Sequence, residues 1–254
     1  DIQEGTRGSR QEHARPLLCQ LTNAESALAG NNNASALLLA LPALAKGKEV
    51  VVSRGEELEI GGGFRIPDVL VQSGATLVEV GTTNRTYARD YEAAISDRTG
   101  AILLVHSSNF RVTGFVHSPS LAELVRIGGE HGVPVLHDLG SGCLLDTTQF
   151  GLAQEPMPQE SIQSGVGLAF FSGDKLLGGP QSGIIVGSRE LVGAVSRHPL
   201  ARAVRIDKMS MAGLAATLLH YVRDEALDKI PIWRMVATSG DELESTARRW
   251  AESL

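Results

Sequence analysis

The chain has 254 residues, 43% of them hydrophobic, and a formal net charge of −6 at pH 7, so it can bury a sizeable core in one large domain or in one domain and a fragment. No apolar run approaches the roughly 18 residues of a membrane span, no secretion signal opens the chain, and the acidic balance argues against general nucleic-acid binding. Because Cys19 and Cys143 lie far apart and lack metal-ligand spacing, we expect no disulfide framework, no metal site and a cytoplasmic protein.

Short apolar runs alternate with helical patterns along the chain. Each run is too short for a core helix and is bounded by glycine or polar residues, which is typical of buried parallel strands. The strands that we expect are 49–53, 76–80, 101–105, 133–137, 166–171 and 183–187. The last two are joined too closely for a crossover helix, so we expect this pair to be antiparallel.

Helical patterns lie between these strands. The clearest covers 118–132, where Ser120 and Glu123 form a capping box and Gly132 ends the helix. Weaker patterns cover 91–95 and 189–195. We therefore expect an α/β fold with a mainly parallel sheet of the seven-stranded type, covered by helices on both faces. Ligands of such a sheet lie beyond the carboxyl ends of its strands.

The pattern changes near residue 209. From there the sequence is helical through Trp250 and the strands cease. We expect residues 1–208 to form the catalytic core. We expect residues 209–254 to contain a bridging helix and the start of a truncated C-terminal small domain.

The first candidate binding feature in chain order is the polar turn 29–35, which opens into the apolar run 36–41. It contains Asn32, Asn33 and Ala34. The free N–H groups and the dipole of a helix N-terminus suit a phosphate. An asparagine-capped helix that binds no ligand is the alternative.

Two later strands end in groups that suit a flat, ring-shaped ligand. The run 101–105 leads to His106 and Asn109, and the Asn109 amide can hydrogen-bond a ring hydroxyl. The run 133–137 leads to Asp138, and a carboxylate there can face a protonated pyridine nitrogen. The alternatives are an ordinary loop asparagine and a turn or capping aspartate.

The stretch 172–183 says most about the chemistry. Lys175 follows the apolar run 166–171 and is surrounded by glycines. We expect burial to favour its neutral amine, which attacks an aldehyde to form a Schiff base, and Ser172 offers a hydroxyl to a phosphate. Pyridoxal 5′-phosphate carries an aldehyde, a flat ring and a phosphate together. A surface lysine is the alternative.

The order of these groups favours the coenzyme. A phosphate turn, Asn109, Asp138 and Lys175 follow one another, and the last three each lie at the end of a separate predicted strand. All of these groups are much less expected to occur in this order by chance than any one of them is expected to occur alone.

Positive charge gathers in the segment 197–208. Arg202 and Arg205 are three residues apart and share a face if the segment is helical. A solvated basic face and an anion pocket are both open interpretations.

Several longer strings carry a family resemblance. The most specific is 171–187, and the others are 5–10, 31–34, 50–55, 59–68, 79–86, 138–142 and 155–160. Through these strings the sequence resembles the bacterial selenocysteine synthases, the L-seryl-tRNA(Sec) selenium transferases. The resemblance runs through nearly the whole chain, at least to His220.

The resemblance implies an aspartate-aminotransferase-like fold, pyridoxal phosphate bound at Lys175, and conversion of seryl-tRNA(Sec) to selenocysteinyl-tRNA(Sec). In that reaction the serine loses its α-proton and β-hydroxyl, and selenium from selenophosphate is then added. Asp174 matches a position regarded as essential in the family. Arg202 and Arg205 match arginines that face the selenium donor, which favours the anion pocket. The family also forms homo-oligomers built from dimers, with active sites at subunit interfaces.

The sequence departs from the family pattern at its ends. An upstream tRNA-binding domain and a His-Thr-Asn-Leu-Gly-Arg motif are not found in it, and the family's C-terminal domain is longer, so we expect a fragment or a shortened relative. Two further interpretations are open. One is a related pyridoxal-phosphate lyase that eliminates from a small amino (sugar) acid, and the other is a catalytically silent fragment that only oligomerises.

Overall fold

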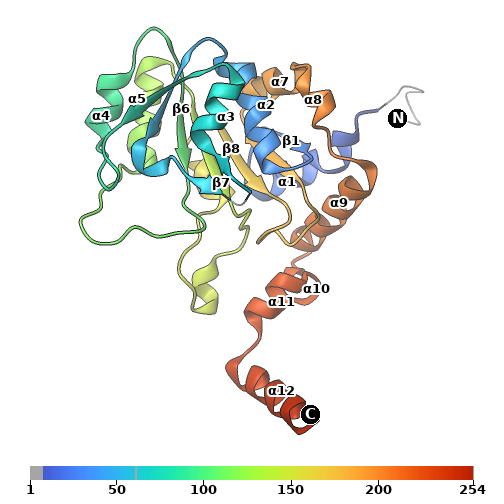
Figure 1. The fold of residues 1–254 in the computed structure, drawn as a ribbon. Helices are drawn as coiled ribbons and strands as arrows, with labels where there is room; N and C mark the ends of the chain where they lie inside the picture. The colour runs from blue at the N-terminus through green and yellow to red at the C-terminus, as the bar shows by residue number, and fades with distance from the viewer. Residues whose placement is uncertain (1–7, 61, 254) are drawn as a thin grey trace.

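The structure, a computed structural model, describes residues 8–60 and 62–253, and its centre is a seven-stranded sheet in the order β1-β9-β8-β7-β6-β2-β5 (Figure 1). Residues 5–7 and Gly61, which fall in two of the strings that carry the resemblance, lie outside the described residues. The strands of the sheet are β1 (Ser26–Gly30), β2 (Glu49–Ser53), β5 (Thr76–Val80), β6 (Thr99–Val105), β7 (Val135–Gly140), β8 (Leu168–Ser172) and β9 (Gly183–Gly187). A separate hairpin consists of β3 (Glu59–Ile60) and β4 (Phe64–Arg65).

The strand directions follow the sequence-based expectation. Strands β2, β5, β6, β7 and β8 run parallel, whereas β9 is antiparallel to both of its neighbours, β8 and β1. The mainly parallel sheet and its antiparallel final pair are therefore confirmed.

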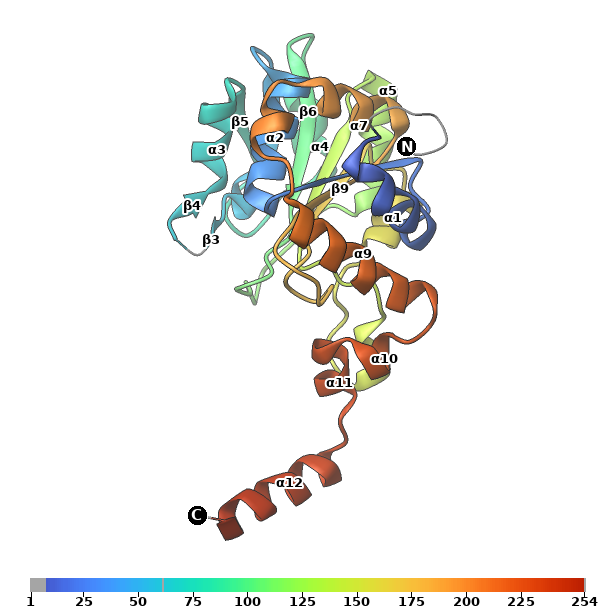
Figure 2. The ribbon, with the colours of Figure 1, turned by 90° about the vertical axis from the view of Figure 1, so that its right-hand side faces the viewer.

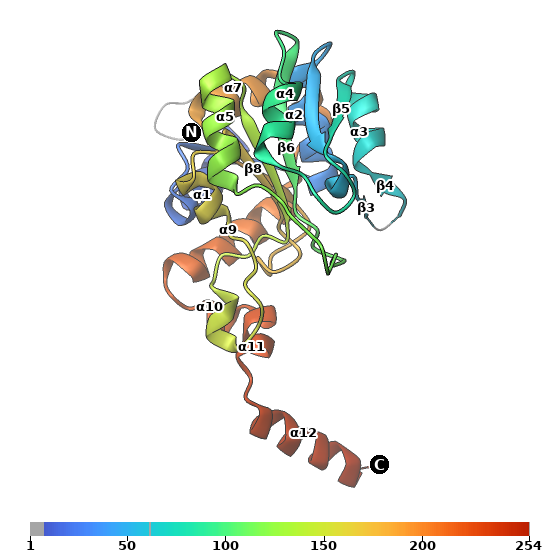
Figure 3. The ribbon, with the colours of Figure 1, turned by 90° about the vertical axis from the view of Figure 1, so that its left-hand side faces the viewer.

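Helices cover both faces of the sheet, as expected (Figures 1, 2 and 3). The α-helices are α1 (Arg15–Thr22), α2 (Asn33–Ala45), α3 (Ile66–Ser73), α4 (Ala88–Ala94), α5 (Leu121–His131), α6 (Pro158–Gln163), α7 (Arg189–Arg197), α8 (Leu200–Ala203), α9 (Lys208–Val222), α10 (Ala226–Lys229), α11 (Pro231–Ala237) and α12 (Gly240–Ser253). Short 3₁₀ helices occur at η1 (Arg10–His13), η2 (Arg54–Glu56) and η3 (Thr147–Phe150). Helix α5 has the predicted capping box of Ser120 and Glu123, and it ends at Gly132, whose φ of 66° is left-handed.

The sheet separates two hydrophobic cores because successive side chains of a strand point to opposite faces. In β2, Val51 joins the core shared with α1, α4, α5 and α9, whereas Val50 and Val52 join the core shared with α2, α3 and α7. Ile102 and Leu103 of β6 divide between the same two cores. Burial on both faces explains why these strands are continuously apolar.

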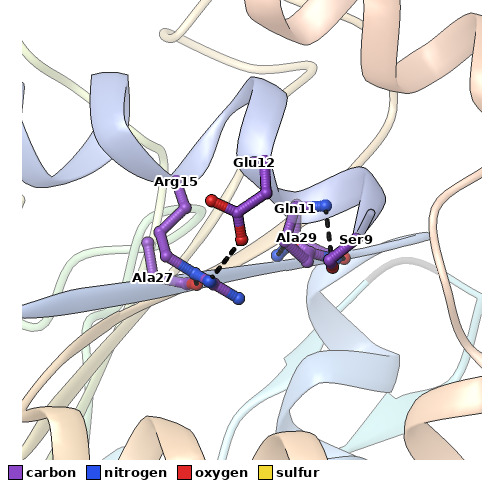
Figure 4. A network of polar contacts seen from close by, with 6 residues as sticks. All are labelled: Ser9, Gln11, Glu12, Arg15, Ala27 and Ala29. Atoms are coloured by element: carbon purple, nitrogen blue, oxygen red, sulfur yellow. Dashed lines mark hydrogen bonds and ion pairs between the residues drawn. The ribbon is translucent and has the colours of Figure 1, made fainter. Parts of the chain in front are cut away.

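Strand β1 was not predicted, since its sequence Ser-Ala-Leu-Ala-Gly has little β-propensity. Pairing with β9 makes it a strand, and side chains of the preceding helices protect its outer edge (Figure 4). The Gln11 amide exchanges two 2.9 Å hydrogen bonds with the backbone of Ala29, and Arg15 Nε donates to the Ala27 carbonyl at 3.1 Å. A sheet edge satisfied in this way has few free groups for another chain to pair with.

The boundaries of β7 differ from the expected 133–137. The strand begins at Val135 rather than Val133, in keeping with Pro134, which has no N–H to donate to a ladder. It runs on to Gly140, so Asp138 lies inside the strand, opposite Val105 of β6 and Phe170 of β8. This register places the backbone of Asp138 between two neighbouring strands.

The segment after residue 208 is helical, as expected. Its first part packs on the core: Met211 and Leu214 of α9 and Trp233 of α11 are buried, and the Trp233 ring lies 5.8 Å from that of Phe150. Helix α12 extends away from the rest of the molecule (Figures 2 and 3), and none of its described side chains is buried. Among the described residues, no helix combines the length and apolarity needed to cross a membrane.

Candidate active site

A cavity of about 300 Å³ lies at the carboxyl ends of β6, β7 and β8 and beside the start of α2. It brings together most of the side chains that the sequence singled out: Asn32, Asn33, Ala34, His106, Asn109, Asp138, Ser172, Asp174 and Lys175. They come from four separate parts of the chain, and their meeting follows from the parallel order of the strands.

Asp138 is the most deeply placed of these groups, with 2% of its surface exposed. Burial raises the pKa of its carboxyl group to about 6, while the hydrogen bond from Asn33 and the nearby charge of Lys175 act in the opposite direction. The Asn33 amide donates to Asp138 Oδ1 at 2.8 Å. The backbone N–H of Gly140 also favours the charged form of this buried carboxyl, which is therefore available to a cationic partner in the cavity.

The turn 29–35 forms the N-terminus of α2, as expected. Asn32 is its N-cap and accepts a 2.8 Å hydrogen bond from the Ser35 N–H. The Asn33 and Ala34 N–H groups make no hydrogen bond within the described residues, and both residues line the cavity. These are the free N–H groups that suit an anion.

Lys175 lies in the turn that follows β8, and there one expectation is wrong. The residue is exposed, not buried, because the turn carries it beyond the end of the strand. Burial therefore does not desolvate its amine in this structure. The amine does face the cavity: a Cβ on Gly140 would lie only 3.6 Å from Lys175 Nζ.

The neighbours of Lys175 differ in burial. Asp174 is exposed, whereas Ser172 is buried at the end of β8, where it pairs with Gly183. Gly142 is required beside Ser172, because a Cβ at position 142 would lie 2.3 Å from the Ser172 carbonyl oxygen, and its φ is +68°.

His106 and Asn109 follow β6. The His106 N–H donates to the Asp138 carbonyl at 2.8 Å, which fixes the two residues side by side. Asn109 is exposed and its amide makes a 3.5 Å contact with the Glu59 carbonyl, a weak hydrogen bond that a better partner can replace.

Arg202 and Arg205 do not line this cavity. They are also not on one helical face, because α8 ends at Ala203, and Arg205 instead forms a β-bridge with Gly30. Both are exposed, and the bridge places Arg205 just before the α2 turn, where the Asn31 N–H donates to the Val204 carbonyl at 2.9 Å.

Six residues that the sequence did not single out also line the cavity: Leu58, Phe64, Val105, Ser108, Gly140 and Gln181. Leu58 and Phe64 come from the hairpin region of β3 and β4, which carries no periodic signal. Phe64 supplies an aromatic ring that can stack on a flat ligand. Two signals pointed to it: its place after a run of glycines, which allow close approach of a backbone, and its place in the string 59–68, which carries part of the family resemblance.

The groups of the cavity fit pyridoxal phosphate. The buried carboxyl of Asp138 suits a pyridinium nitrogen, the free N–H groups of α2 suit a phosphate, and the Lys175 amine suits an aldehyde. The buried Asn33 Oδ1 has no hydrogen-bond partner among the described residues, which shows that the cavity wall still has an acceptor to satisfy.

Fold and site together define a chain of the aminotransferase-like class of pyridoxal-phosphate enzymes. More particularly, the chain belongs to the L-seryl-tRNA selenium transferase family, whose family model matches residues 1–254.

Curated relatives agree with this assignment. The chain is 59% identical over 256 residues to the L-seryl-tRNA(Sec) selenium transferase of Geobacter metallireducens and 52% identical over 249 residues to that of Carboxydothermus hydrogenoformans. These matches cover 100% and 98% of this chain, but 55% and 53% of the relatives. The chain thus spans about half the length of the curated relatives it matches.

Solved structures share the fold. D-glucosaminate-6-phosphate ammonia-lyase matches with a TM-score of 0.69 at 22% identity, over 87% of this chain and 60% of that chain. Aspartate aminotransferase from Thermus thermophilus matches with a TM-score of 0.64 at 18% identity, over 93% of this chain and 62% of that chain. At these identities the likeness concerns the fold alone.

Proposed function

We propose that this chain carries the coenzyme-binding and catalytic part of a transferase that converts seryl-tRNA(Sec) to selenocysteinyl-tRNA(Sec) with selenophosphate. The observation that carries the proposal is the meeting of Asp138, Lys175 and the N-terminus of α2 in one cavity. Membership of the family supplies the substrate class.

Each group has a proposed part in the reaction. Pyridoxal phosphate, when bound, supplies an electron sink for negative charge at the serine α-carbon. Asp138 holds a proton on the pyridine nitrogen, the Asn33 and Ala34 N–H groups with Ser172 bind the phosphate, and Asn109 hydrogen-bonds the ring hydroxyl. Lys175 holds the coenzyme and then moves the α-proton, and Asp174 beside it helps to place the amine.

The selenium donor is proposed to bind at Arg202 and Arg205. Both guanidinium groups belong to exposed residues, and the β-bridge of Arg205 with Gly30 places its backbone next to the turn that leads into the cavity. Guanidinium groups suit the doubly charged, phosphate-like donor because they offer several N–H donors in one plane.

The remaining proposals concern partners and domains. We propose a homo-oligomer built from dimers and the division into residues 1–208 and 209–254, with the later segment leading towards a second domain. The exposed apolar side chains of Leu243 and Trp250 on α12 favour a second domain, since they suit burial against another part of the protein.

The test is turnover by the purified chain given pyridoxal phosphate, seryl-tRNA(Sec) and selenophosphate, with Lys175→Ala as the control. Selenocysteinyl-tRNA that forms only with Lys175 present agrees with the proposal. Ammonia release from a small amino sugar acid instead would identify the alternative lyase, and coenzyme binding without turnover of either substrate would identify a silent fragment.

A further inference from the structure

A second cavity, of about 700 Å³, adjoins the coenzyme cavity. The two share Val105, His106 and Ser108 in their walls. His106 therefore lies between them. A group in the second cavity can act on the coenzyme cavity through the His106 imidazole.

The backbone of His106 is already fixed, because its N–H donates to the Asp138 carbonyl at 2.8 Å. Its imidazole is partly enclosed, with 28% of the side chain exposed. In the second cavity His106 Nε2 lies 3.5 Å from Glu155 Oε1, and the Glu155 side chain is 24% exposed. The distance is longer than that of a good hydrogen bond, and it leaves room to shorten when a ligand closes the site.

Glu155 is held firmly by its surroundings. Its N–H donates to Thr147 Oγ1 at 3.0 Å, and the buried Thr147 hydroxyl donates to the Ala153 carbonyl at 2.7 Å. Pro156 follows, and Pro158 begins α6. Because this segment is already constrained, Glu155 loses little further conformational entropy when its carboxylate holds the side chain of His106.

Besides His106 and Glu155, the ionisable side chains that line the second cavity are Glu56, Arg85, Arg111, His117 and His137, and of these His137 and Glu56 have hydrogen-bond partners of their own. His137 is bonded through Nδ1 to Ser161 Oγ at 2.9 Å, and burial together with the charge of His106 lowers its pKa to about 4. Burial raises the pKa of Glu56, in the second cavity, to about 7, and its carboxylate accepts the Val105 N–H at 2.8 Å. On the coenzyme side, the charged neighbours are Asp138, Asp174 and Lys175.

We propose that Glu155 is a positioning residue for the coenzyme cavity: its carboxylate attracts His106 Nε2 and so fixes the imidazole in the wall that the two cavities share. The inference rests on the proposed function for the identity of the coenzyme. It gives a role to the string 155–160, which carries part of the family resemblance and otherwise has no assigned chemistry.

The experiment is a double-mutant cycle on the affinity for pyridoxal phosphate, measured by fluorescence for the wild type, Glu155→Gln, His106→Ala and the double variant. Glu155→Gln is expected to weaken binding about five-fold in the wild-type background and less than about two-fold in the His106→Ala background. Glu190→Gln, which removes an exposed carboxylate on α7, is the matched control and leaves the affinity unchanged. An equal loss in both backgrounds overturns the proposal, because a purely structural role does not require His106.

A second readout needs no coenzyme. Long-range ¹H–¹⁵N spectra of the imidazoles, with His106 identified by the signal missing in His106→Ala, report which ring nitrogen carries the proton. Glu155→Gln is expected to reduce protonation at Nε2 of His106, and unchanged His106 signals overturn the proposal. A wild-type chain that binds no pyridoxal phosphate refutes the proposed function instead, and these spectra then decide alone whether Glu155 orients His106.

Discussion

Asn33 Nδ2 donates a 2.8 Å hydrogen bond to Asp138 Oδ1, which ties the first residue of α2 to the middle of the sheet across 105 residues of sequence. Asn33 was predicted from its place in a phosphate turn. The structure gives its side chain a different partner: the amide stabilises the carboxylate that we propose for the pyridine nitrogen. The Asn33 backbone N–H, which we propose for the phosphate, makes no hydrogen bond to any residue that the structure describes.

The first prediction concerns this hydrogen bond. Asn33→Ala removes a donor to the charged form of Asp138, so the pKa of Asp138 rises above its value of about 6. A hydrogen bond to a charged group contributes about 1.5–3 kcal/mol, which corresponds to a rise of about one to two pH units. The measurement is the pH titration of the Asp138 carboxyl carbon by NMR. Asn31→Ala, an exposed asparagine of the same turn, serves as the control, and an identical titration in both variants would contradict the role given to Asn33.

The second prediction concerns stability against pH. The pKa of Asp138 is about 6 in the folded chain, against 3.8 for an unperturbed aspartate, so the folded state binds the proton more tightly. The wild type therefore loses free energy of unfolding as pH rises from about 4 to about 6, by up to about 3 kcal/mol, and loses no more from this group above that range. Asp138→Asn removes this loss. Urea unfolding of the wild type and of Asp138→Asn, both without coenzyme, measures the free energy of unfolding across that pH range. The same pH dependence in both chains would refute the prediction.

The third prediction concerns Asp138 and the coenzyme. Asp138→Ala and Asp138→Asn both lack the anion, so both retain pyridoxal phosphate less well than the wild type, although Asp138→Asn keeps the shape of the side chain. A loss of about ten-fold or more in affinity is expected, since charge-assisted hydrogen bonds are the stronger class. Equilibrium dialysis measures it. Wild-type affinity in Asp138→Asn would mean that shape alone matters at this position.

The fourth prediction concerns glycines. Gly142→Ala would place a methyl group 2.3 Å from the Ser172 carbonyl oxygen at a φ of +68°, so we expect a loss of at least about 2 kcal/mol in the free energy of unfolding. Gly129→Ala, in α5, meets no atom within 4 Å and should instead gain about 0.5–1 kcal/mol from helix propensity. Urea unfolding compares the two, and equal effects would show that the close approach at Gly142 is not needed.

The fifth prediction concerns the selenium donor. Arg205→Ala is expected to weaken selenophosphate binding about ten-fold or more while the affinity for pyridoxal phosphate stays the same. Arg197→Ala, in the last turn of α7, is the control for loss of positive charge in the same region. Calorimetry measures both ligands. If binding of both weakens together, Arg205 supports the fold near Gly30 and does not bind the donor.

The sequence predicted the strands that are buried on both faces, because they are rich in β-branched and large apolar residues and are bounded by glycine. It missed β1 because alanine and glycine give no strand signal, and the strand state there comes from pairing with β9. It also missed the β3–β4 hairpin, whose strands have only two residues each.

The candidate site was predictable to the extent that parallel strands bring their carboxyl ends together. Asp138 and Lys175 could be named because each comes directly after, or shortly after, an apolar run that predicts a buried strand. The exposure of Lys175, the contact of Asn33 with Asp138 and the presence of Phe64 in the cavity could not, since they depend on how a turn, a helix start and a hairpin pack against one another.

The central claim is that pyridoxal phosphate is held at Lys175, and borohydride reduction followed by peptide mass spectrometry tests it most directly. Incubated with the coenzyme and then reduced, the chain should carry one pyridoxyl group on the peptide that contains Lys175, and Lys175→Ala should carry none. A label on Lys208 or Lys229 instead, or an unlabelled wild type, would contradict the account.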